Sequence, residues 1–235
     1  MIISHKYKFI FLKTSKTAGT SIEIALSKFC SENDVITPIS PKDELVRSDL
    51  GYKGPQNYMF PLSNYKIIDW VNVLFKYKNK RWKQFYNHIT AQRVKNMIDP
   101  NIWNTYYKFC FERNPWDRVV SQYYWRLSEP RMSMKLFLKS KHFKDLIKKG
   151  RNVYTINNEI AVDKIYKYEF INDAIIDLSE KFKFTQKLEL PRTKSTSRPK
   201  KRQYSDILNL DEKKYIGEVF EKEIINLDYE FQGEY

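Results

Sequence analysis

Residues 9–21 read Phe-Ile-Phe-Leu-Lys-Thr-Ser-Lys-Thr-Ala-Gly-Thr-Ser, and this stretch decides the fold. The apolar run predicts a strand over about Tyr7 to Lys13, and the residues after the loop predict a helix from near Thr20 towards Phe29. A strand, a loop of small hydroxyl residues with one glycine and a lysine, and then a helix is suited to holding a phosphate. The unpaired first-turn N–H groups and the positive end of the helix dipole would face the same anion. The alternative is a Ser/Thr-rich turn with Thr20 as an N-cap.

A second strand–helix junction has related chemistry. Tyr106 to Glu112 is predicted as a strand, and Asn114-Pro115 then begins a helix that runs from Trp116 to Leu127. Arg113 stands at the end of the strand, where a planar guanidinium can bind a phosphate with two hydrogen bonds. Ser121 follows two helical turns later and adds a hydroxyl. Taken alone, an Arg and a Ser at this separation are in most cases ordinary surface residues, but here they follow an apolar strand and accompany the first loop.

The remaining pattern alternates strands with helices. A strand is expected at Lys164 to Tyr168, and further helices are expected at Ala91–Ile98 (capped by Thr90), Met134–Lys139, Asn172–Lys181 and Asp211–Leu227. This α/β alternation predicts a parallel sheet with helices on both faces, whose ligands bind at the carboxyl ends of the strands. Residues 37–64 should be mostly loop with one short helical piece. The pattern of residues 65–86 does not distinguish a helix from a strand.

Composition sets bounds on partners and compartment. The 235 residues include 42 basic and 28 acidic ones, a net charge of +14, which fits polyanionic partners but also a chain rich in Lys, Asn and Ile. Cys30 and Cys110 are expected to be small buried residues in a reducing compartment. We recognise no signal peptide and no apolar stretch long enough to span a bilayer, so a soluble cytoplasmic protein is expected.

Together the two junctions resemble those of sulfotransferases that use 3'-phosphoadenosine 5'-phosphosulfate (PAPS). Lys16 to Ser21 resembles that family's loop for the 5'-phosphosulfate, and Arg113 to Ser121 resembles its 3'-phosphate motif. The closest branch contains carbohydrate sulfotransferases and short bacterial and phage-borne relatives. The likeness extends through four further segments: Asn87–Ala91, Tyr168–Phe170, Thr193–Tyr204 and Leu227–Phe231.

The resemblance implies a fold and a domain layout. The fold would be α/β with three layers, similar to that of P-loop NTPases, with a central, mostly parallel sheet. One domain would cover residues 1–235, with residues 37–86 as a variable, acceptor-side insertion. The basic segment 192–204 would cover the nucleotide.

The resemblance also implies roles for individual residues. Lys16 would stabilise the departing 5'-phosphate, and the loop around that phosphate would consist of Thr17, Ala18, Gly19, Thr20 and Ser21. Arg113 and Ser121 would bind the 3'-phosphate. In the late basic segment the candidates are Ser195, Lys200 and Arg202, and the alternative is a solvated charge run. No acidic pair stands out as a magnesium site, so no metal is expected.

The acceptor hydroxyl needs a base, and His88 matches a histidine that the glycan branch uses for this purpose. The alternative is a capping or core histidine. Glu23 is a rival base, although a first-turn glutamate favoured by the helix dipole is the preferred interpretation for it. The aromatic cluster Tyr123-Tyr124-Trp125 should be core, with one ring able to stack on adenine. The run Lys76 to Lys83 either lines an acceptor groove or is an exposed face.

We therefore expect a PAPS-dependent sulfotransferase that acts on a hydroxyl, preferably of a carbohydrate, with no nucleic-acid partner. An ATP-dependent phosphotransferase is one alternative, but the loop lysine precedes its single glycine, which departs from nucleotide-triphosphate loops. A non-enzymatic nucleic-acid-binding protein is another. It is disfavoured because the basic residues gather at strand–helix junctions and one late loop. The sequence leaves the acceptor and the oligomeric state open.

Overall fold

The computed structural model of the protein describes residues 1–74, 83–126, 132–191 and 203–232. Most of the two basic runs noted in the sequence falls between these ranges. Three of the predicted nucleotide ligands, Ser195, Lys200 and Arg202, also lie outside the described residues.

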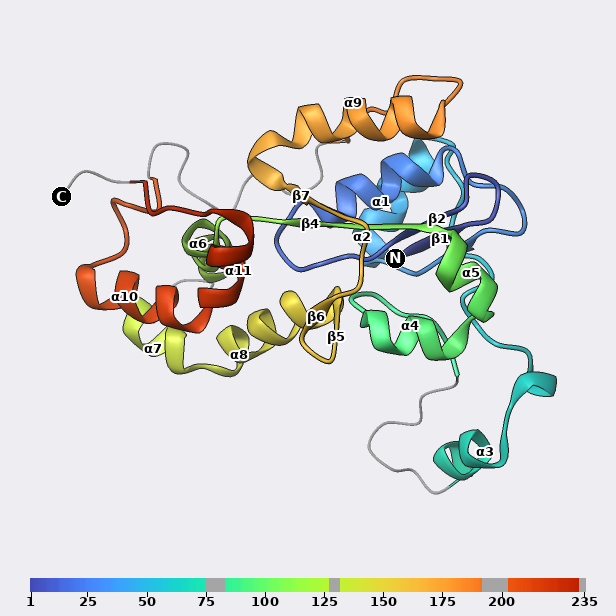
Figure 1. The fold of residues 1–235 in the computed structure, drawn as a ribbon, viewed down its shortest axis with the longest axis horizontal. Coiled ribbons are helices and arrows are strands. Elements are labelled where there is room, and N and C mark those ends of the chain that lie inside the picture. The colour runs from blue at the N-terminus through green and yellow to red at the C-terminus, as the bar shows by residue number, and fades with distance from the viewer. Residues whose placement is uncertain (75–82, 127–131, 192–202, 233–235) are drawn as a thin grey trace.

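A mixed five-stranded sheet lies at the centre, with strand order β3-β1-β2-β4-β7 (Figure 1). The strands are β1 (Ile2–Ser4), β2 (Phe9–Phe11), β3 (Val35–Ile36), β4 (Tyr107–Glu112) and β7 (Lys164–Lys167). β2, β4 and β7 are parallel, as predicted. The expected mostly parallel sheet is a mixed one, because β1 pairs antiparallel with both β2 and β3 at one edge. The turn that joins β1 to β2 is too short for the crossover that a parallel pair needs.

Helices cover both faces of this sheet, which gives three layers. The odd-numbered phenylalanines of β2 pack with α1 (Gly19–Ser27) and α9 (Ile171–Phe182). Ile10 points to the opposite face and packs with α4 (Ala91–Met97) and α5 (Pro100–Thr105). Figure 1 shows α1 and α9 on one side of the sheet and α4 on the other. The alternation of side chains along a strand therefore supplies each helical layer with its own apolar core.

A further core lies beside the sheet and is built mainly from helices, with Tyr204, Leu208 and Tyr229 added from the segments between and after them. Its helices are α6 (Pro115–Arg126), α7 (Met134–Lys139), α8 (Lys141–Lys148), α10 (Leu210–Val219) and α11 (Glu221–Leu227). The prediction of one helix over Asp211–Leu227 is wrong, because the helix breaks at Phe220. This residue leaves helical geometry (φ −110°, ψ 22°), and its fully buried ring lies edge-on to that of Phe143.

The predicted loop before residue 65 contains α2 (Pro41–Asp49) and a 3₁₀ turn (Leu62–Asn64), one helical piece more than expected. The ambiguous segment after it begins with the helix α3 (Ile67–Leu74). A second 3₁₀ turn (Arg151–Val153) precedes β5, and a third (Tyr168–Phe170) joins β7 to α9. A small hairpin, β5 (Thr155–Ile156) with β6 (Glu159–Ile160), was not predicted.

Both cysteines are buried and neither forms a disulfide. Burial raises the pKa of the Cys30 thiol and of the Cys110 thiol. Within the described ranges, every helix is too short or too polar to cross a membrane.

A buried ion pair joins the end of β4 to α6 and to the end of α8. Arg118 donates to Glu112 Oε2 at 2.6 Å and to the Leu146 carbonyl at 3.1 Å, and its side chain is fully buried. The backbone of Gly150 passes directly over this guanidinium. A Cβ added at Gly150 would lie 2.0 Å from Arg118 Nη2.

We predict that Gly150→Ala destabilises the protein, because the clamped guanidinium must leave its two partners to make room for the methyl group. The expected loss is about 1–3 kcal/mol of unfolding free energy, the usual cost of overpacking. Urea denaturation measures it, with Gly54→Ala as the matched control, since a Cβ at Gly54 meets no atom within 4 Å. Equal midpoints for the two variants would contradict the prediction.

Candidate active site

The two predicted junctions open onto one cavity of about 410 Å³ at the carboxyl edge of the sheet. They meet because β2 and β4 are adjacent and parallel, so the loops that follow them lie at the same edge. Eight of the site residues expected from the sequence line this cavity: Lys16, Ala18, Gly19, Thr20, Ser21, His88, Arg113 and Ser121. The remaining lining residues are Lys13, Thr14, Ser15, Ile39, Ser40, Asp43, Asn87, Trp125 and Tyr168.

The loop after β2 is wound tightly around the start of α1. Lys16 and Ala18 both have a left-handed backbone, with φ of 67° and 58°. The helix begins at Gly19 with Ala18 in the N-cap position and without a side-chain cap, so Thr20 is not the N-cap. The first-turn N–H groups of α1 therefore lie at the end of the helix that borders the cavity.

Thr17 is the loop residue that does not line the cavity. Its side chain is buried, and its Oγ1 lies 2.9 Å from Thr14 Oγ1. Thr14 in turn donates a short hydrogen bond to the Phe111 carbonyl on β4. The hydroxyls on this side of the loop thus bind the loop to the neighbouring strand.

The Lys16 ammonium stands over an aromatic ring. Its Nζ lies 4.6 Å from the centre of the Trp125 ring on α6, a distance typical of cation–π attraction. Of the aromatic cluster expected to be core, Tyr124 is buried, whereas Trp125 is 41% exposed and lines the cavity. One ring of that cluster therefore forms part of the cavity wall.

Arg113 connects the second junction to the first. Its Nε donates to Asp117 Oδ2 at 2.7 Å, and its Nη1 donates to the Lys16 carbonyl at 3.2 Å. The guanidinium carbon lies 4.3 Å from the centre of the Tyr168 ring at the end of β7. These contacts fix the plane of the guanidinium at the cavity wall, which is what a group that binds phosphate with two hydrogen bonds requires.

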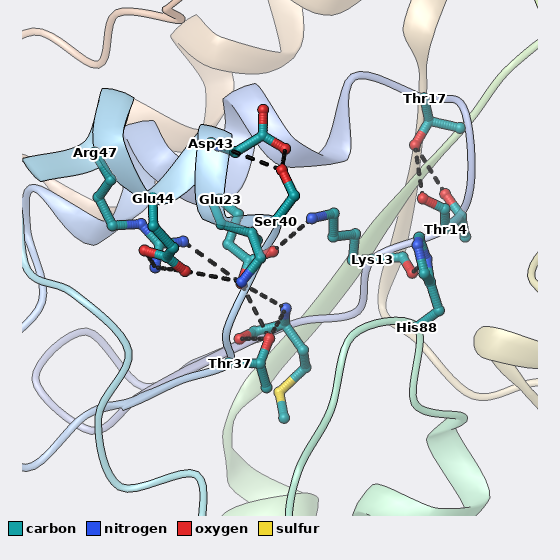
Figure 2. A network of polar contacts seen from close by, with 12 residues as sticks. Lys13, Thr14, Thr17, Glu23, Thr37, Ser40, Asp43, Glu44, Arg47 and His88 are labelled. Carbon is teal, nitrogen blue, oxygen red and sulfur yellow. Dashed lines mark hydrogen bonds and ion pairs between the residues drawn. The ribbon is translucent and has the colours of Figure 1, made fainter. Parts of the chain in front are cut away.

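His88 lines the cavity and lies in the loop before Thr90, the observed N-cap of α4. Its Nδ1 lies 2.8 Å from the Lys13 carbonyl (Figure 2). A carbonyl only accepts, so Nδ1 carries the proton and the neutral ring keeps its lone pair on Nε2. Burial, together with repulsion by the Lys13 ammonium, lowers the pKa of His88 to about 3. The ring is therefore neutral at physiological pH.

Glu23 does not line the cavity, and it is not a first-turn residue of α1. Its carboxylate is fully buried and is surrounded by nitrogen groups: Lys13 Nζ at 2.9 Å, the Met1 amino group at 3.0 Å and Arg47 Nη2 at 3.8 Å (Figure 2). The interpretation based on the helix dipole is therefore wrong, because Glu23 lies in the middle of a nine-residue helix.

Sequence reasoning missed several cavity residues. Lys13 was assigned to the strand, and Tyr168 to the end of another. Ser40 and Asp43 lie at the start of α2 in the segment that resisted interpretation, and their side chains are joined by a hydrogen bond of 2.6 Å. The one available signal was the Ser-Pro step at residues 40 and 41, which predicts a helix start.

Comparison with known proteins agrees with this geometry. A model of the sulfotransferase family matches residues 1–155, more than half of the chain. The chain belongs to the sulfotransferase family. It is also similar to an uncharacterized protein of Archaeoglobus fulgidus, at 29% identity over 104 residues, which cover 43% of this chain and 87% of that protein. No solved structure matches the chain.

The family assignment makes the protein a transferase with a donor and an acceptor substrate. The matched region contains both junctions, since it runs from β1 to β5. Among the described residues, no group of three or more His, Cys, Asp or Glu side chains is arranged to hold a metal ion.

We predict that His88 makes the protein less stable in acid. Its pKa is about 3 when folded and about 6.5 when unfolded, so the unfolded chain gains a proton as the pH falls through this window. His88→Asn keeps a donor for the Lys13 carbonyl but cannot titrate. Between pH 6.5 and pH 4.5 the variant should lose roughly 2 kcal/mol less unfolding free energy than the wild type. Urea melts at the two pH values measure this, and His142→Asn on α8 is the control. Parallel losses in wild type and His88→Asn would show that the folded ring also titrates near 6.5.

Proposed function

We propose that this member of the sulfotransferase family transfers the sulfuryl group of PAPS to an acceptor hydroxyl, preferably of a carbohydrate. The observation that carries the proposal is the single cavity shared by the loop of Lys16, the start of α1, and the pair Arg113 and Ser121. Two groups suited to anions on adjacent parallel strands match a donor with a phosphate at each end of a ribose. In the same proposal the whole chain is one sulfotransferase domain.

The donor would bind with its two phosphates at separate places. The 5'-phosphosulfate lies at the start of α1, where the backbone of residues 17–21 and the hydroxyls of Thr20 and Ser21 surround it. The 3'-phosphate lies against the guanidinium of Arg113 and the hydroxyl of Ser121. The exposed ring of Trp125 is suited to stacking on adenine.

The chemistry then needs one base and one cation. The acceptor hydroxyl gives its proton to Nε2 of His88, and its oxygen forms a bond to sulfur. The bond between sulfur and the bridging oxygen of the 5'-phosphate breaks, and the electron pair stays on that oxygen. Lys16 stabilises the charge that develops there, so the products are a sulfate ester and adenosine 3',5'-bisphosphate. An anionic donor beside His88 would also raise its pKa and make it a stronger base.

The acceptor would enter over α2. Ile39, Ser40 and Asp43 bring the segment 37–86 into the cavity wall, which supports the proposal that this segment shapes acceptor specificity. Asn87 Oδ1 is buried there and has no hydrogen-bond partner among the described residues. A carboxylate, a hydroxyl and an amide oxygen around one cavity are suited to an acceptor rich in hydroxyl groups.

We predict that adenosine 3',5'-bisphosphate binds at least ten-fold more tightly than adenosine 5'-monophosphate, because only the first reaches Arg113 and Ser121. Isothermal titration calorimetry measures both. Arg113→Ala should weaken the bisphosphate about ten-fold or more, the value of one charge-assisted contact, and leave the monophosphate nearly unchanged. Arg151→Ala is the matched control, since Arg151 lies outside the cavity. Equal affinity of the wild type for the two nucleotides would remove the roles given to Arg113 and Ser121.

We predict that His88→Asn binds the donor normally but transfers sulfate about 10²–10⁴ times more slowly, the usual contribution of a positioned base. The measurement is single-turnover transfer from ³⁵S-labelled PAPS to a mixture of simple saccharides. Unchanged melting temperature at pH 7.5 shows that the Lys13 carbonyl is still satisfied. Transfer at the wild-type rate would assign the base to another residue.

A further inference from the structure

Lys13 is a cavity residue whose role no motif indicates. It follows β2 directly, its side chain is only 3% exposed, and it borders the cavity beside the phosphate loop. Its aliphatic stem packs against the first residue of α1, since a Cβ added at Gly19 would lie 2.7 Å from Lys13 Cγ. Its Nζ donates to Glu23 Oε2 at 2.9 Å. The ammonium is thus placed between the cavity and a buried carboxylate.

Glu23 is held by more cations than a simple ion pair needs. Burial opposes its ionisation, but attraction by the Lys13 ammonium, together with the Met1 amino group and Arg47, prevails and lowers the pKa of Glu23 to about 2. The Thr37 hydroxyl also donates to Oε1 at 3.0 Å. Figure 2 shows Lys13, Thr37 and Arg47 converging on Glu23 from the phosphate loop, the end of β3 and α2.

The charges in this cluster balance at neutral pH. Burial lowers the pKa of the Met1 amine to about 5, so this amine is mostly neutral. The remaining groups are Lys13 and Arg47 against Glu23 and Glu44, whose Oε2 lies 3.0 Å from Arg47 Nη1. Removal of one carboxylate would therefore leave a buried positive charge next to the cavity.

A buried ion pair rarely adds stability over a well-packed apolar pair, because both charges lose their water. A lysine at the cavity wall can attract a bound anion, which an apolar residue cannot do. This attraction is strong because little water lies between the buried ammonium and the cavity. On the proposed function, the group that arrives at this wall is the 5'-phosphosulfate.

We propose that Lys13 is a second cation for the 5'-phosphate end of the donor, and that Glu23 is a positioning residue that holds its ammonium at the cavity wall. This inference rests on the proposed function. Glu23 competes with the phosphate for the same ammonium, so it keeps Lys13 in place and at the same time weakens nucleotide binding. The loop then has two cations of different kinds, Lys16 over an aromatic ring and Lys13 against a carboxylate.

The test uses calorimetry with adenosine 5'-monophosphate and adenosine 3',5'-bisphosphate on four variants. Lys13→Met should weaken both nucleotides by the same factor, about ten-fold or more, because both carry the 5'-phosphate. Lys13→Arg keeps the charge and should stay within about three-fold of wild type. Glu23→Gln should lower the melting temperature of the protein and yet raise its affinity for both nucleotides by about three- to ten-fold. A merely structural role would not raise affinity in a less stable protein.

The fourth variant, Lys13→Met with Glu23→Gln, keeps the test decisive if Glu23→Gln alone does not fold. This double variant removes both charges of the ion pair. It should bind both nucleotides about five-fold or more weakly than wild type, because the phosphate has lost a cation. Wild-type affinity in the double variant would overturn the inference, as would unchanged or weaker binding in a folded Glu23→Gln protein.

The inference and the proposed function fail in different ways. The inference is tested by the dissociation constants of the variants for the monophosphate, each compared with that of the wild type. The proposed function is read from the preference of the wild type for the bisphosphate. If the wild type bound both nucleotides equally but the variants changed affinity as expected, only the proposed function would be overturned. If the wild type preferred the bisphosphate but the variants bound the monophosphate as the wild type does, only the inference would be overturned. A wild-type protein that binds neither nucleotide would overturn both.

Discussion

Parallel pairing of β2 with β4 is the constraint on which the site depends. The register places Phe11 beside Phe109, and the Leu12 N–H donates to the Phe109 carbonyl at 2.9 Å. The Thr14 hydroxyl extends this pairing into the loop through its bond to the Phe111 carbonyl. A slip of one residue would turn the apolar side chains of β2 to the wrong layer, so the register is fixed by both cores. The two loops meet at one cavity because these adjacent parallel strands end at the same edge of the sheet.

The sequence predicted the parts of the fold whose pattern is local. β4, α6 and the phosphate loop follow from an apolar run, a proline at the helix start and a cluster of small residues, and the observed bounds differ from the predicted ones by a residue or two. The antiparallel edge was missed because β1 and β3 are three and two residues long and wholly buried, which leaves no alternation to detect. The break at Phe220 depends on what its ring packs against, which a helical period does not reveal.

The site could be predicted only as far as its residues sit in motifs. Lys16, Arg113 and His88 were found in this way, and they line one cavity. Lys13 and Glu23 are ten residues apart in sequence and form a pair only because α1 folds back along β2. Such a contact has no sequence signal. The cations of the cavity also share a property that the net charge of +14 conceals: each has a partner within the protein, in Trp125, Asp117 or Glu23. These partners hold the charged groups in fixed positions around the cavity, where they can attract an anion.

The cavity also lies at the junction of two separately packed halves. α1 belongs to the core that the sheet shares with α9, whereas α6 belongs to the helical core beside the sheet. A molecule that touches both Ser21 and Ser121 ties these halves together, and its binding energy is added to the free energy that opposes their separation. At a hundred times its dissociation constant, such a molecule would contribute about 2.7 kcal/mol. A ligand in this cavity would thus also stabilise the packing of the two cores against each other.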